Sequence, residues 1–230
     1  MNTATHPIRA DFKDNHLLHF LMAWYALVWT VTAIRPIDPR DWLMENVVVF
    51  AVMGLLVATY RVFPLSDVSY LLLTGFLTVH AIGAHYTYSR VPFGFWLQET
   101  FQFSRNHFDR IAHFAFGFAV AYPFREVFLR LGRPRDGWAY FLPIDLVLAI
   151  AALFEIFESW VVRRVDPALG EAYLGSQGDI WDAQKDMTAS LEGAILCMVV
   201  TGILRRRLRK RAVAVMEYVG AGHARHVRTR

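Results

Sequence analysis

Apolar residues along this chain gather in runs of about 20, separated by shorter polar stretches. A run of that length is what an α-helix needs to cross the hydrocarbon core of a bilayer. The pattern therefore predicts an all-α fold, a polytopic transmembrane helical bundle of about six spans. The expected spans are residues 16–34, 43–62, 68–88, 109–131, 141–162 and 182–204.

The fourth span has the weakest hydrophobic signal of the six. Its uninterrupted apolar core, residues 114–124, is short and contains Gly117 and Pro123. Proline is tolerated in a spanning helix when neighbouring groups satisfy the carbonyl that it leaves free. We therefore keep this run as a span.

Polar and basic segments flank the apolar runs and suggest three parts. Residues 1–15 are expected to form a polar cytoplasmic N-terminus, residues 16–204 the membrane domain, and residues 205–230 a basic cytoplasmic tail. The first apolar run is longer than the core of a signal peptide, and no small-x-small cleavage site follows it, so we expect an uncleaved helix. Between the third and fourth spans, the aromatic segment 93–103 is typical of an amphipathic stretch at the outer interface.

Basic residues predict the orientation in the membrane. Arginines gather after the sixth span and around the loop between the fourth and fifth spans, and such residues favour the cytoplasmic side. An even number of spans then places both termini in the cytoplasm, in a bacterial inner membrane. The formal net charge of +4 is explained by the same bias, so the expected partner is the lipid bilayer and no nucleic acid. The single cysteine, Cys197, excludes an intrachain disulfide.

This topology brings acidic residues and histidines from separate helices to the outer face of the membrane. The candidate metal ligands are Asp109, His113, Glu155, Glu158, Asp179, Asp182 and Asp186. His80, His85 and His107 are further candidates at the same end. Within each segment the spacing is three, four or seven residues, which places the members on one helix face. The helix face that carries Asp179, Asp182 and Asp186 continues through Ala189, Ser190 and Gly193. Such small residues let membrane helices approach closely.

A structural explanation of these acids competes with a functional one. Asp179 follows a glycine and is suited to cap the sixth helix, with Asp182 in its first turn. The deeper acids need partners, because an ionised carboxylate inside a membrane is costly unless it is paired, hydrated or protonated. Arg110, Arg163 and Arg164 are the arginines able to form such an ion-pair network.

The functional alternatives are a metal site, an acid–base site and a transport path. Mixed His, Asp and Glu ligands suit a divalent metal ion, although the compact H-E-x-x-H signature of zinc enzymes is missing. In an enzyme, His113, Glu155, Glu158 and Asp186 are the candidate catalytic groups, acting on a lipid-linked envelope precursor or another small-molecule substrate. In a small transporter, the same carboxylates and Glu192 would carry protons or cations. The sequence leaves enzymatic activity open.

The polar motifs also resemble those of a known family. In order they read N106-H107-F108-D109-R110-x-x-H113, R125-E126, E155-x-x-E158 and G175-x-Q177-G178-D179-x-W181-D182-x-Q184-x-D186-M187. They are similar to the YjdF family of bacterial inner-membrane proteins, whose function is unknown. The resemblance implies an integral inner-membrane protein with its motifs in the C-terminal half.

A weaker likeness is to VanZ-like membrane proteins, which are associated with glycopeptide resistance. Asp109, His113, Glu155 and Asp182 fit their pattern of polar residues. At Asp186 that pattern has an asparagine, so this likeness implies no shared chemistry.

Overall fold

The computed structural model describes residues 12–135, 137–165 and 167–227 and contains only helices and their connections. A short 3-10 turn, Phe12–Asp14, precedes the first helix. The helices are α1 (His16–Ala33), α2 (Pro39–Tyr60), α3 (Asp67–His85), α4 (Pro92–Phe101), α5 (Phe108–Leu131), α6 (Trp138–Val162), α7 (Pro167–Leu174) and α8 (Asp182–Val227). The all-α prediction is confirmed.

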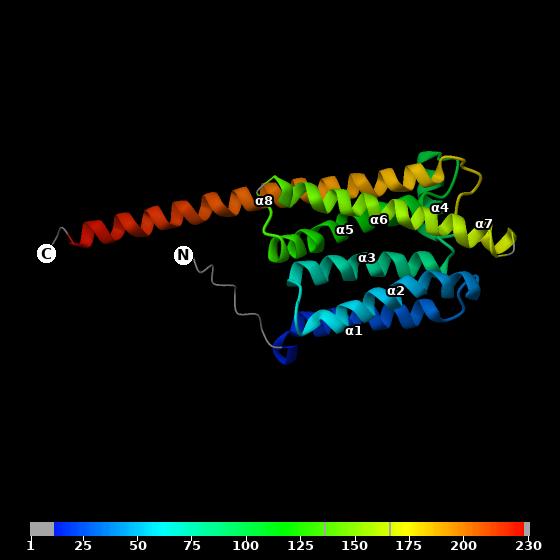
Figure 1. Cartoon of the computed structure of the whole chain (residues 1–230), viewed down its shortest axis with the longest axis horizontal. Coiled ribbons are helices and arrows are strands. Elements are labelled where there is room, and N and C mark those ends of the chain that lie inside the picture. Colours follow the sequence, from blue (N-terminus) through cyan, green and yellow to red (C-terminus); the bar gives the residue numbers. More distant parts are fainter. Residues whose placement is uncertain (1–11, 136, 166, 228–230) are drawn as a thin grey trace.

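The long helices form two layers that run along one common axis (Figure 1). One layer contains α1, α2 and α3, and the other contains α5, α6 and α8. Helix α5 packs against α8, α6 and α3, so it joins the two layers. The short helices α4 and α7 lie at one end of the bundle, and α8 extends beyond the bundle at the other end (Figure 1).

Five helices in the described part of the chain are long and apolar enough to cross a membrane. They are α1, α2, α3, α6 and the first 32 residues of α8. Helix α5, with 24 residues, has the length of a membrane span but carries several charged groups. Its position between α3, α6 and α8 explains the weak hydrophobic signal of this predicted fourth span, because protein rather than lipid surrounds much of it.

The end of the last helix differs from the sequence prediction. The sixth span was expected to end at residue 204, but α8 continues as a helix to Val227. Arginine, leucine and alanine after residue 204 are good helix formers and no proline interrupts them, so charge alone does not end the helix. The connections 89–108 and 163–181 contain α4 and α7. Residues 1–11 of the predicted cytoplasmic N-terminus lie outside the described residues.

Glycines bring α5 and α8 unusually close together. A Cβ atom at Gly117 of α5 would lie 1.9 Å from the carbonyl oxygen of Ser190 in α8. A Cβ atom at Gly193 of α8 would lie 2.1 Å from the carbonyl oxygen of Phe114. The stripe of small residues on α8 therefore faces the bundle, as the sequence predicted, and it allows the backbone-to-backbone approach seen in membrane helix pairs.

A carboxylate ties the two layers together at the end from which α8 extends. Glu126 of α5 accepts hydrogen bonds from the Ser66 hydroxyl at 2.7 Å and from the Ser69 hydroxyl at 2.5 Å, at the start of α3. The same residue is paired with Arg130, one turn further along α5. This contact fixes the register of α3 against α5 at the end opposite the acidic cluster.

Candidate acid and histidine site

The seven predicted ligands lie together at the end of the bundle that carries α4 and α7. Helix α5 contributes Asp109 and His113 in its first two turns, and α6 contributes Glu155 and Glu158 near its last turn. Asp182 and Asp186 begin α8, and Asp179 precedes it. The alternating helix directions predicted from the sequence thus bring these residues to one end. Their function as ligands or catalysts stays a prediction.

Two arginines neutralise Asp179 and Asp182, which form the first part of this cluster. Arg105 and Arg110 each place one Nη atom 2.5 Å from the same oxygen, Oδ1 of Asp182. Arg110 also donates a hydrogen bond to Asp179 Oδ2 at 3.1 Å, and Lys185 donates one to the same oxygen at 2.7 Å. These contacts are charge-assisted and form a continuous network, so Asp179 and Asp182 have the ion-pair role that competed with the metal hypothesis.

Asp179 was predicted to cap the sixth helix, but α8 begins three residues later and Asp179 forms a local turn before it. Its Oδ1 accepts a hydrogen bond from the backbone N–H of Trp181 at 3.1 Å, just before α8 begins. The hydrogen bond from Lys185 is the largest of several effects that hold the pKa of Asp179 below its usual value. The carboxylate is therefore ionised and is held by its basic neighbours and by this turn.

Arg105 is held in place by the loop before α8, and the sequence analysis missed its role. It donates hydrogen bonds to the carbonyl oxygens of Ser176 at 2.8 Å and Gly175 at 3.0 Å. Next to it, the Gln177 side chain bonds both the backbone N–H and the C=O of Asn106, at 3.1 and 2.9 Å. The motif residues Gly175 and Gln177 thus join two loops that are far apart in sequence.

The second part of the cluster, around Asp109, His113 and Asp186, has the geometry of a cation site. Asp109, His113 and Asp186 each present a ligand atom, and these three atoms lie within 4.8 Å of one another. The Nε2 atom of His113 is 3.7 Å from Asp109 Oδ1 and 3.9 Å from Glu155 Oε1. The Nε atom of Arg110 approaches Asp186 Oδ1 at 2.9 Å, without the alignment of a hydrogen bond.

A serine in α8 sets the orientation of the histidine ring. The Ser190 hydroxyl donates its hydrogen to the carbonyl oxygen of His113 at 3.2 Å, and its oxygen lies 3.4 Å from His113 Nδ1. In the tautomer that carries its proton on Nδ1, the ring donates to the serine oxygen and Nε2 is the nitrogen available to a metal ion.

Several acids in this region have no arginine or lysine partner among the ion pairs of the described residues. Glu155 Oε1 is buried without a hydrogen-bond partner, and Glu158 is its neighbour one turn along α6. Helix α2 adds Asp41, whose two buried oxygens also lack a partner, and Glu45, which is 5 % exposed. Such groups are costly as bare anions, so they require protons or a bound cation.

Asp41 and Glu45 were not among the predicted site residues, although the sequence contains a signal for them. The predicted topology places the start of the second span at the same outer end as the other acids. The two residues are four apart and share one helix face. The same reasoning that selected Glu155 and Glu158 would have included them.

The remaining candidate histidines and arginines lie outside the group of Asp109, His113 and Asp186. His80 Nδ1 is hydrogen-bonded to the Tyr88 hydroxyl at 2.6 Å, and burial raises the pKa of that hydroxyl. His85 Nδ1 contacts the carbonyl oxygen of Thr32 at 2.8 Å. His107 precedes α5, where burial and then the Arg105 charge lower its pKa. Arg163 and Arg164 are exposed, and the ion pairs of the described residues do not include them, so this part of the network prediction was wrong.

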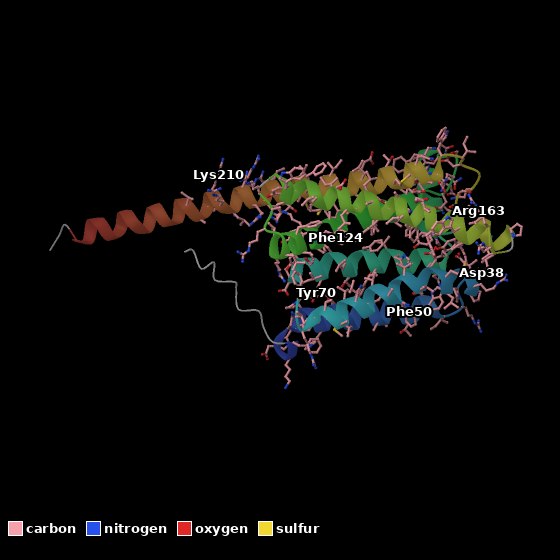
Figure 2. The ribbon with its side chains drawn as sticks, in the orientation of Figure 1. Asp38, Phe50, Tyr70, Phe124, Arg163 and Lys210 are labelled. Atoms are coloured by element: carbon pink, nitrogen blue, oxygen red, sulfur yellow. The ribbon has the colours of Figure 1, made fainter. Side chains whose placement is uncertain are left out.

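A cavity of about 720 Å³ extends from the unpaired acids between the two layers. Its polar lining lies near the site and includes Glu45, Asp109 and Glu158. Towards the other end the lining is almost entirely apolar and includes Tyr70 and Phe124, which Figure 2 labels far from the site end marked by Asp38 and Arg163. Of the unpaired acids, Glu45 and Glu158 therefore open into a long hydrophobic space.

Comparison with known proteins identifies relatives. Residues 17–207 match the model of a family described as "Predicted membrane protein (DUF2238)". The chain is 37% identical over 175 residues to the inner membrane protein YjdF of Escherichia coli (strain K12), which covers 75% of this chain and 83% of that protein. No solved structure matches the chain significantly.

Proposed function

We propose a function for this chain, which belongs to the DUF2238 family of membrane proteins, together with YjdF. It would hold a divalent cation within the membrane bundle and use it on a lipid or another envelope precursor. The ligands would be Asp109, His113 and Asp186, with Glu155 beside them. In this proposal Glu155 and Glu158 are the acid–base groups. The protein would lie in the inner membrane with both termini in the cytoplasm and the site at the periplasmic end.

The observation that carries this proposal is the set of ligand atoms gathered around His113. Three ligand atoms from α5 and α8 lie within 4.8 Å of one another, and Glu155 Oε1 is close by without a hydrogen-bond partner. One imidazole nitrogen with several carboxylate oxygens is a set that suits zinc, manganese or iron. A cation there would offset the charge of Asp109 and Glu155, whose only ion-pair partner among the described residues is His113.

The surrounding residues support acid–base chemistry at this point. When bound, a divalent metal supplies a Lewis acid and an activated water. Glu155 and Glu158 lie one helical turn apart beside it, and such a pair can exchange a proton with a substrate if one carboxyl is protonated. Arg110 would orient Asp186, and Ser190 would orient the His113 ring.

The other two functions make different predictions. A proton or cation transporter needs polar groups along the whole path, whereas the polar lining of the cavity lies at one end. A purely structural ion network explains Asp179, Asp182 and Asp186, each of which has an arginine partner. It does not explain Glu155, Glu158 and Asp41.

Metal analysis of protein purified in detergent tests the proposal. We expect about one divalent ion per chain, lost in the His113→Ala and Asp186→Asn variants. Glu192→Gln is the matched control, because Glu192 lies on α8 but is exposed. A metal-free wild-type protein that also fails to bind added zinc or manganese would refute the proposal.

A further inference from the structure

We infer that the cavity holds the hydrocarbon chain of a membrane lipid whose polar end carries hydroxyl or ammonium groups and no negative charge. The inference rests on the proposed function, since it names the class of substrate for the same site. Three features support it: the lining of the cavity, its opening and its charge.

The lining forms continuous apolar stripes on the helices that face each other across the layers. On α5 the lining positions run from Ala112 through Val120 to Leu131. On α2 they run from Val48 to Leu56, and on α6 they include Ile150 and Ala151. A volume of about 720 Å³ is within the usual range of ligand pockets. An elongated apolar space of this kind suits an extended hydrocarbon chain.

The cavity opens sideways, along α2. Val48, Val52 and Leu55 line the cavity and are also 36% exposed or more, so the space reaches the outer surface of the bundle there. Helix α2 packs on α3 and α7, whereas α6 packs on α5, α7 and α8. In a bilayer, this surface would face lipid tails, so a lipid could enter without passing through water.

Charge at the site end selects the polar part of the ligand. The lining contains Glu45, Asp109 and Glu158 but no lysine or arginine among the described residues. Arg105 and Arg110 are already bonded to Asp179 and Asp182. Even if Asp109 helps to hold a divalent cation, Glu45 and Glu158 keep this end acidic or hydrogen-bonding. A hydroxyl or ammonium group matches it, and an anionic group does not.

Tyrosines at the same end add hydrogen-bonding groups for such a lipid. Tyr88 and Tyr173 both line the cavity beside the carboxylates. Burial raises the pKa of the Tyr173 hydroxyl, so the group stays protonated and can donate a hydrogen bond. Together the carboxyls and hydroxyls form a polar end on an otherwise apolar space.

Photoreactive lipids test the inference in the full-length protein in vesicles. Three reagents share one diazirine-bearing chain and differ in the polar end: a long-chain amine, a monoacylglycerol and a fatty acid. Peptide mapping should find the amine and the monoacylglycerol on lining residues of α2, α3 and α5. Labelling by the fatty acid should be weaker by on the order of tenfold, because the described lining has no lysine or arginine to pair with its carboxylate.

Two pairs of variants provide matched controls. Ala151→Trp on α6 and Leu73→Trp on α3 fill the cavity, and both should lose this labelling. Ala149→Trp and Leu71→Trp change exposed positions on the same helices outside the lining and should keep it. Labelling that is equal in all four variants, or equally strong with the fatty acid, would overturn the inference.

Metal content of the same samples separates this inference from the proposed function. If the cavity is labelled but no metal binds, the lipid cavity stands and the cation site fails. If metal binds but labelling stays on the outer surface, the cation site stands and the lipid cavity fails.

Discussion

The close crossing of α5 and α8 gives the most specific prediction about stability. Replacing Gly193 with alanine would put a Cβ atom 2.1 Å from the Phe114 carbonyl oxygen, whereas ordinary contact begins at 3.4 Å. The helices must therefore move apart by about 1.3 Å or distort. Overpacking of this kind costs about 1–3 kcal/mol. For a chain of this size, about 2–4 °C is lost per kcal/mol, so the midpoint of thermal unfolding should fall by roughly 2–12 °C.

The same change should also weaken the site, because Ser190 and His113 lie at this crossing. Their hydrogen bond, 3.2 Å from the serine hydroxyl to the histidine carbonyl oxygen, bridges α8 and α5. Gly202→Ala is the matched control on α8, since its Cβ atom would lie 3.6 Å from the Tyr140 ring, an ordinary contact. Thermal unfolding in detergent and metal content should change in Gly193→Ala alone. Equal behaviour of the two variants would refute the close crossing.

Three further predictions concern the ion network and the orientation. Arg110→Ala leaves Asp186 without its cation and should cost about 3–5 kcal/mol in the free energy of unfolding, measured with denaturant, whereas the exposed Arg164→Ala should have little effect. The lowered pKa of Asp179 means that its stabilisation is complete above the unfolded value of about 3.9 and is lost as the pH falls towards the folded value. Asp179→Asn should therefore flatten the dependence of the unfolding midpoint on pH in this acidic range, and an unchanged slope would contradict the pairing. A reporter enzyme that works only in the cytoplasm should be active when fused to the C-terminus, and a silent fusion would reverse the orientation.

Periodicity and length predicted much of the fold because membrane helices have strict requirements. The bilayer thickness fixes the length of an apolar run, and loop charge fixes its direction. Since the directions alternate, residues as distant in sequence as Asp109 and Asp186 were expected at one end, where the structure has them. The end of α8 was predicted poorly because nothing at the membrane boundary stops a helix, and good helix formers continue to Val227.

The sequence did not predict that the acidic cluster divides into an arginine-paired part and a part around His113. Spacing places Asp182 and Asp186 on one helix face, but it does not say which arginine reaches them. The choice of Arg105 over Arg163 depends on the loop contacts of Gly175 and Gln177, which are tertiary. The cavity could not be predicted for the same reason. Its lining consists of apolar residues in α2 and α5, which in the sequence look like ordinary core or lipid-facing positions. Only the separation of the two helices shows that a space lies between them.

The nitrogen ligand offers the most direct test of the central claim, a cation held by Asp109, His113 and Asp186. Protein loaded with one equivalent of Mn²⁺ can be measured by pulsed electron paramagnetic resonance, which detects a nitrogen bonded to the metal. We predict a single imidazole ¹⁴N coupling in the wild type and in Glu192→Gln, and its loss in His113→Ala. Mn²⁺ that stays free in solution, or a spectrum with no nitrogen coupling in the wild type, would contradict the claim.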